Sequence, residues 1–119
     1  QMVNNYNSIL RDLKKTLMST GLPMETGVFS DQAPEEYLVI IPMNDLFDLF
    51  ADNLPQMDLQ EARISLFAKG NYMARKNQIV ALLIAGDFTI TDRRYIGKEA
   101  DTGFHHIVID VAKEYAVTL

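Results

Sequence analysis

The sequence predicts a single α+β domain in which two helices pack on a mixed or antiparallel sheet, in the order α-β-β-β-α-β-β. Two observations predict this fold. In two segments, apolar residues recur at spacings of three and four, as they do in amphipathic helices. The other apolar runs are short, rich in β-branched and aromatic residues, and bounded by Gly, Pro, Asn and Asp, which is typical of strands and hairpins. We find no linker, internal repeat or low-complexity tract, so we expect one domain over residues 1–119.

The first helix is expected from about Asn5 to Thr20, with Asn4 or Asn5 capping its start. Gly21 tolerates a left-handed conformation and Pro23 lacks an amide hydrogen, so these two residues should end the helix. Its apolar stripe consists of Tyr6, Ile9, Leu10, Leu13 and Leu17.

A short strand within Met24–Asp31, around residues 27–29, and then a central strand are expected next. Tyr37–Ile41 is apolar on both faces, which predicts a strand covered on both sides. Pro42 should stop it, because proline cannot donate to a sheet ladder. Phe47–Ala51 is then expected to pair with Ala62–Ala68 as a hairpin. A helical turn over Leu46–Phe50 is the alternative.

The connection between those two hairpin strands, residues 52–59, is predicted to be a long protruding loop. The second helix should run from Asn71, which can cap it, to Ala85, with Gly86 at its end. Its stripe consists of Tyr72, Met73, Lys76, Ile79, Val80 and Leu83. Phe88–Tyr95 and Phe104–Lys113 should then form a second hairpin, with residues 96–103 as its tip.

Composition excludes several classes of protein. The chain has no cysteine, which rules out disulfides, thiolate nucleophiles and the common structural zinc sites. A net charge of −5 argues against general affinity for nucleic-acid backbones. No apolar run reaches the roughly 18–20 residues of a membrane span, and the polar start predicts no signal peptide. We expect Met2 to be the natural start and Gln1 to be a remnant of expression cloning.

The residues that could carry chemistry favour structural roles. His105 and His106 are neighbours on a predicted strand, so they point to opposite faces and cannot grip one ion. Asp92 or Arg94 is expected to pair across strands with Asp110 or Lys113. No serine lies in a nucleophile elbow, no glycine cluster cradles a phosphate, and the acidic residues lack calcium-loop spacing. We therefore predict no catalytic, cofactor-binding or metal-binding residues and expect no enzyme. The acidic residues are Asp45, Asp48, Asp52 and Asp58.

Large apolar residues also lie outside the obvious core, on a strand that should be peripheral. Leu46-Phe47 and Leu49-Phe50 occupy both of its faces, and Met43, Leu54, Met57 and Leu59 lie near it. Two interpretations stay open: a core wrapped by helices on both sides, or a subunit interface, because large exposed apolar patches usually mark partners.

Several segments together resemble the tail-completion, or tail-terminator, proteins of siphophages and of prophages in Gram-positive bacteria, which are often described as minor capsid proteins. The likeness lies in overall pattern, covers most of the chain after Tyr37, and is carried by Leu49-Phe-Ala-Asp-Asn53, Glu61-Ala-Arg-Ile-Ser-Leu-Phe-Ala-Lys-Gly-Asn-Tyr72, Asp87-Phe-Thr-Ile-Thr-Asp-Arg-Arg-Tyr95, Thr102-Gly-Phe-His-His106 and Ile109-Asp-Val-Ala-Lys-Glu-Tyr115.

The resemblance implies a structural role in the virion tail or neck, reached from the host cytoplasm during assembly. Such proteins form a ring, in the family a hexamer, that caps the head-proximal end of the tail tube and offers a surface to head-side connector proteins. DNA passes through as cargo, and no membrane or cofactor is involved. The loops at 52–59 and 96–103 are the expected docking segments. The expected interface residues are Phe47, Phe50, Leu54, Met57, Arg63, Arg93 and Arg94.

Three other functions compete with this interpretation. Another neck component of the same virion, such as a head-completion or connector protein, would share the small size and acidic charge. A small enzyme would need a deep pocket with converging ionisable groups. A nucleic-acid-binding module would need a basic face and salt-sensitive DNA binding.

Overall fold

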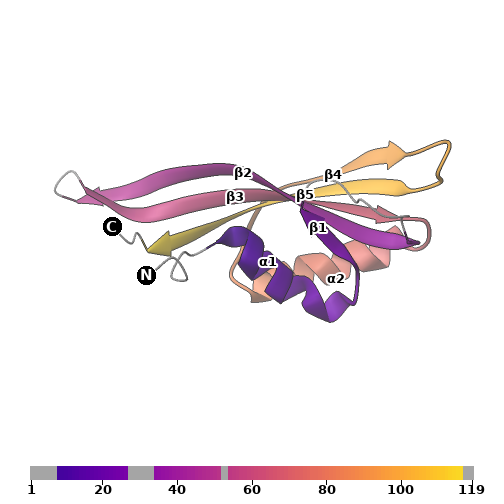
Figure 1. Cartoon of the computed structure of the whole chain (residues 1–119), viewed down its shortest axis with the longest axis horizontal. Helices are drawn as coiled ribbons and strands as arrows, with labels where there is room; N and C mark the ends of the chain where they lie inside the picture. The colour runs from indigo at the N-terminus through magenta and orange to yellow at the C-terminus, as the bar shows by residue number, and fades with distance from the viewer. Residues whose placement is uncertain (1–7, 27–33, 52–53, 117–119) are drawn as a thin grey trace.

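The computed structural model describes residues 8–26, 34–51 and 54–116, and of residues 26, 45–51 and 54–56 only the backbone. It shows one five-stranded sheet with two helices (Figure 1), which confirms the predicted element order. The strand order is β1-β2-β3-β5-β4. β1 runs parallel to β2 and the other neighbours are antiparallel, so the sheet is mixed. The strands are β1 (Met24–Thr26), β2 (Glu36–Ala51), β3 (Leu54–Ala68), β4 (Thr89–Lys98) and β5 (His105–Ala116).

The first helix, α1, spans Ile9–Leu17 and continues as a 3₁₀ turn, η2, over Met18–Thr20. The predicted cap at position 4 or 5 is wrong, because the Ser8 side chain accepts the hydrogen bond from the Arg11 amide at the helix start. Gly21 ends the helix as predicted. It adopts the left-handed conformation with φ of 74°, which a residue with a Cβ rarely adopts.

The start of α1 is fastened to the sheet by two long-range hydrogen bonds. The Ile9 amide donates to Oε1 of Gln60 at 2.8 Å, and the Tyr115 hydroxyl donates to Oδ2 of Asp12 at 2.7 Å. Burial, and then this hydrogen bond, raise the pKa of Tyr115 well above its usual value, so its hydroxyl stays a donor. Both contacts fix where α1 begins along β3 and β5.

The second helix, α2, spans Tyr72–Ala85 and has the predicted ends. The Asn71 side chain accepts from the Ala74 amide at 3.1 Å, and the Gly86 amide closes the last turn. The predicted stripe is correct for Ile79 and Leu83, which are buried, and wrong for Met73, which is 50% exposed.

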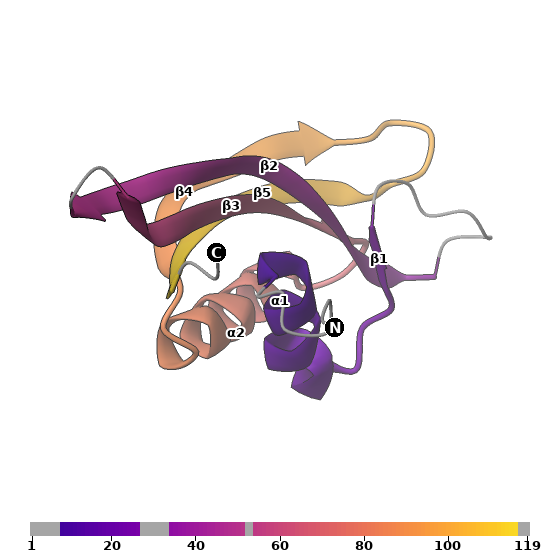
Figure 2. The same ribbon diagram turned by 60° about the vertical axis from the view of Figure 1, so that its left-hand side comes forward.

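Both helices lie on one face of the sheet (Figures 1 and 2), where Leu13 and Leu17 of α1 meet the inward side chains of the strands. The prediction of a β2 covered by helices on both faces is therefore wrong. The strand residues of this core alternate along β2, β3 and β5, as the period of two requires. They are Leu38, Ile40, Ala62, Ile64, Leu66, Ala68, Ile107, Ile109, Val111 and Tyr115.

β2 does not stop at Pro42 but continues to Ala51, with a register shift between Pro42 and Asn44. The physical reason is position in the sheet. Among the described residues, β1 pairs with β2 as far as Ile40, and from Ile41 onward β3 is the only described neighbour of β2. A proline is tolerated there, because its missing amide hydrogen costs no ladder bond on the open side.

The predicted pairing of the first hairpin is also wrong. β2 and β3 pair from Glu36↔Ala68 to Ala51↔Leu54, so most of the expected loop at 52–59 is strand. The helical-turn alternative at Leu46–Phe50 is excluded, since that segment lies in β2. The short strand expected within Met24–Asp31 is present as β1 at Met24–Thr26, and its expected centre at 27–29 lies outside the described part of the chain.

The second hairpin matches the prediction more closely. β4 extends three residues further than expected, so Ile96–Lys98 is strand and the tip is shortened to the segment before His105. Within that tip the Glu99 amide donates to the Phe104 carbonyl and the Gly103 amide to the Glu99 carbonyl, each at 2.8 Å.

The core contact of α1 generates a stability prediction. Leu17 is fully buried, so Leu17→Ala should lower the free energy of unfolding by about 2–5 kcal/mol through lost burial and a residual cavity. Its neighbour Met18 is 66% exposed, so Met18→Ala should stay within about 0.5 kcal/mol. Urea unfolding of the three proteins measures both changes. Equal effects would contradict the placement of α1.

Candidate interaction surfaces

The sheet face opposite the helices is the first candidate surface, since no described helix or strand covers it (Figure 2). Strand register arranges its side chains in rows that cross β2, β3 and β5. The first row is aromatic, with Tyr37, Phe67 and His106. The second row is Val39, Ser65 and Val108, and the third is Ile41, Arg63 and Asp110.

The aromatic row is a continuous stack. The rings of Tyr37 and Phe67 lie 4.8 Å apart and those of Phe67 and His106 4.3 Å apart, both nearly parallel. Phe104 meets Tyr37 and Phe67 edge-on. Such contacts stabilise beyond their buried area. Val39 and Val108, in the next row, are only 6% and 2% exposed although no helix lies above them.

His106 is held in this stack mainly in its neutral form. Burial lowers its pKa from the usual 6.5, with Arg63 contributing in the same direction and Glu99 opposing. His105 points to the other face, as predicted, where its ring stacks on Tyr72 at 4.5 Å and its Nδ1 lies 2.9 Å from the Tyr95 hydroxyl. The two histidines therefore belong to separate aromatic clusters.

Arg63 and Asp110 form the central ion pair of the third row. Nε and Nη2 of Arg63 donate to the two carboxylate oxygens of Asp110 at 2.8 and 3.0 Å, and the hydrogen bond raises the pKa of Arg63. The predicted partners are wrong: Asp110 is bound by Arg63 of β3, and Arg94 binds Asp92 of its own strand at 2.6 Å. Asp92 does face Asp110 across β4 and β5, but as a like charge.

The predicted interface residues fall in three separate places. Arg63 lies mid-sheet in its internal ion pair, and Arg93 and Arg94 border a cleft between α2 and β4. Phe47, Phe50 and Leu54 belong to the far end of the β2–β3 hairpin, where the backbone pairs Phe47↔Asp58, Phe50↔Pro55 and Ala51↔Leu54. Their side chains lie outside the described part.

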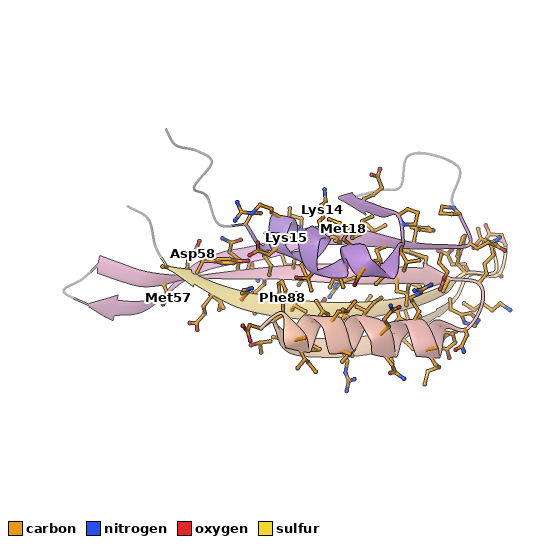
Figure 3. The ribbon with its side chains drawn as sticks, turned by 90° about the horizontal axis from the view of Figure 1, so that it is seen from below. Lys14, Lys15, Met18, Met57, Asp58 and Phe88 are labelled. Atoms are coloured by element: carbon orange, nitrogen blue, oxygen red, sulfur yellow. The ribbon has the colours of Figure 1, made fainter. Side chains whose placement is uncertain are left out.

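Met57, the remaining predicted residue, is half-buried at the base of that hairpin. Figure 3 shows Met57 and Asp58 beyond the ends of both helices. Met57 borders a groove of about 700 Å³ together with Leu59, Glu61, Thr89, Ala112 and Glu114. The groove exists because β4 begins only at Thr89, which leaves the last residues of β5 as a sheet edge. It is open, shallow and mixed in polarity, which suits a partner better than a small substrate.

The cleft between α2 and β4 was missed in the sequence. Its volume is about 270 Å³, and it gathers Tyr72, Met73 and Lys76 of α2 against Arg93, Arg94 and Tyr95 of β4. The sequence did contain a signal for this cleft, because the adaptable Met73 and the charged Lys76 lie within a helical stripe that is otherwise apolar. Their position beside β4 depends on tertiary packing.

Two tests for other kinds of site apply to the described residues. No three acidic or histidine side chains among them converge as a metal ion would require. None of the helices within residues 8–26, 34–51 and 54–116 combines the length and apolarity needed to cross a membrane.

Comparison with models of known protein families gives no match, and comparison with curated proteins gives no significant match either.

The central ion pair yields a prediction with an internal control. Asp110→Asn leaves Arg63 without its charged partner at a site where the Asp110 side chain is only 11% exposed, so it should cost about 1–2 kcal/mol of unfolding free energy. Asp92→Asn, which breaks the exposed pair with Arg94, should cost about 0.5 kcal/mol or less. Chemical denaturation compares the two. A larger loss for Asp92→Asn would refute the assignment of Arg63 to Asp110.

The aromatic row predicts a pH effect. The folded-state pKa of His106 lies below its unfolded value, so below about pH 6.5 the unfolded chain binds more protons and the free energy of unfolding falls as pH falls. His106→Phe keeps the stack without the titration and should reduce the loss between pH 7.5 and 5.5. Unfolding at both pH values measures this, and an NMR titration of the imidazole should give a pKa below 6.5. An imidazole pKa above that value would contradict the burial argument.

Proposed function

We propose that this chain is a structural tail-completion protein of a long-tailed bacteriophage, which forms a ring on the head-proximal end of the tail tube. In this role it acts in the virion neck after assembly in the host cytoplasm. Its partners are further copies of itself, six to a ring as in the family that it resembles, the tail tube protein and a head-side connector. DNA passes through the ring as cargo. No bound cofactor or catalysis is part of the role.

The segments that carry the family resemblance support this proposal by where they lie. Glu61–Tyr72 supplies the second half of β3 and the cap of α2, Asp87–Tyr95 supplies most of β4, and Ile109–Tyr115 supplies the second half of β5. The resemblance therefore involves the sheet and its register rather than one loop. The element order α-β-β-β-α-β-β agrees with the order that the family implies.

The β2–β3 hairpin is the observation that carries the proposal. It projects well beyond both helices along a molecule of 54 × 28 × 23 Å (Figure 1). Its sequence from Asn44 to Ala62 contains many large apolar residues but no Lys or Arg. A long, apolar ribbon without a helix against it is suited to reach a neighbouring protein, since an extended segment presents both side chains and an open edge.

The charge of the chain supports a ring around DNA. The net charge of the chain is −5. An acidic lining repels the phosphate backbone, so DNA can slide without binding. A cyclic ring further needs two different surfaces that meet head to tail, and closure of the ring limits its growth.

Tail-tube capping tests this function directly. Purified protein is mixed with polymerising tail tubes, and the tube ends are imaged by electron microscopy. We expect density on one end of each tube and an arrest of growth. Bare ends with unchanged growth would overturn the proposal and favour a head-side connector of the same virion.

A hairpin variant sharpens the assay. Leu54→Asp combined with Met57→Asp places charge on the apolar ribbon and should abolish capping while the far-UV circular dichroism is retained. Met18→Asp, on the outer side of α1 (Figure 3), adds a charge at an exposed apolar residue and should cap normally. Capping by the double variant at the wild-type level would exclude the hairpin as a contact.

A further inference from the structure

The cleft between α2 and β4 has the chemistry of a docking site for an acidic segment. Lys76 and Arg93 border it, and among the described residues neither has a carboxylate partner. Arg94 adds a third cation, held by Asp92. In a chain of net charge −5, this is a local concentration of positive charge. Complementary charge is what steers and orients a partner at such a surface.

The wall of the cleft is aromatic and already fixed in place. Tyr72 contacts Tyr95, with ring centres 5.4 Å apart, and stacks on His105. The Tyr95 hydroxyl is held by Nδ1 of His105. Met73 and Tyr95 are each 50% exposed, and Ile96 beside them is 49% exposed. Tyrosine, methionine and arginine are enriched at protein interfaces relative to the rest of the surface.

The β2–β3 hairpin has the complementary chemistry. Between Asn44 and Ala62 its charges are all acidic, and its apolar residues include Leu46, Phe47 and Phe50. The hairpin and the cleft lie in opposite halves of the long axis, because α2 begins in the half away from the hairpin (Figure 1). One chain therefore cannot place its own hairpin in its own cleft, whereas a neighbouring copy can.

We propose that the cleft between α2 and β4 binds the acidic β2–β3 hairpin of a second copy of this chain. The contact is heterologous, with one surface meeting a different one, and repeating it closes a ring or extends a filament. The inference rests on the proposed ring for its biological meaning, but the contact itself is testable without tail tubes.

The exposed side of α1 is the natural control surface. Lys14 and Lys15 lie there and Met18 follows at the start of η2 (Figure 3), so this side also offers positive charge next to an exposed methionine. Among the described residues no aromatic wall lies beside these lysines, and neither lysine borders a described pocket. A purely electrostatic attraction would use both surfaces alike. A docking site requires the cleft.

Cross-linking of single-cysteine variants is the decisive experiment, and the absence of native cysteine makes it clean. Met73→Cys in the cleft is mixed with Ala51→Cys at the end of β2, and a short bis-maleimide is added, with and without tail tubes. We expect this pair to cross-link at least about tenfold faster than Ser19→Cys with Ala51→Cys. Equal rates, or no product under either condition, would overturn the proposal.

Charge reversal then tests the direction of the contact. Lys76→Glu with Arg93→Glu in the Met73→Cys protein should slow cross-linking about tenfold or more, and Lys14→Glu with Lys15→Glu, the same change in net charge, should not. Asp45→Lys with Asp48→Lys in the Ala51→Cys protein should restore the rate with the reversed cleft. Equal slowing by the α1 control, or no restoration, would refute a specific contact.

The two proposals fail separately. Capped tubes without the Met73–Ala51 product would leave the tail-completion function standing and refute this contact. The product without capped tubes would establish self-association through the cleft and refute the tail-completion function.

Discussion

The helices of this protein are much shorter than its longest strands, and the rest of the structure depends on this difference in length. The 14 residues of α2 extend about 21 Å, whereas the 16 residues of β2 extend about 50 Å. Two helices on one face can therefore bury only the middle of the sheet, where Leu38, Ile64 and Ile109 lie. The far hairpin and the sheet face opposite the helices must therefore be stabilised without contact to the described helices.

The opposite face is stabilised by side chains alone. The stack from Tyr37 to His106 closes one end and the bidentate pair of Arg63 with Asp110 closes the other, and the valine row between them is shielded from water. The pair contributes because it is partly desolvated and has both hydrogen bonds. Arg63 is therefore held in an ion pair within the chain, and its expected role at an interface stays a prediction.

The sequence predicted what local signals determine and failed where pairing partners decide. Asn71 and Gly86 were correctly predicted as the ends of α2, because helix capping depends on residues that are close together in the sequence. Pro42 was misinterpreted as a stop, because its tolerance depends on the described pairing of β1 with β2 reaching only to Ile40, which no local signal reports. The predicted partner of Asp110 was wrong for the same reason. The two-residue period of a strand shows on which face a side chain lies, but only the strand register shows which residue lies opposite it. The cleft needed α2 to be placed against β4, so it could not be predicted.

The hairpin connects this length mismatch to assembly. Beyond the pairing of Met57 with Ala116, β2 and β3 are the only strands in the described part of the chain, and a two-stranded ribbon has little independent stability in water. In the contact that we propose, the cleft of a second copy would bury the apolar sequence of this ribbon and pair its carboxylates with cations. In the proposed ring each copy would make the contact twice, once with its hairpin and once with its cleft. Closure would then fix the number of copies, because the sheet that separates hairpin and cleft sets the angle between them.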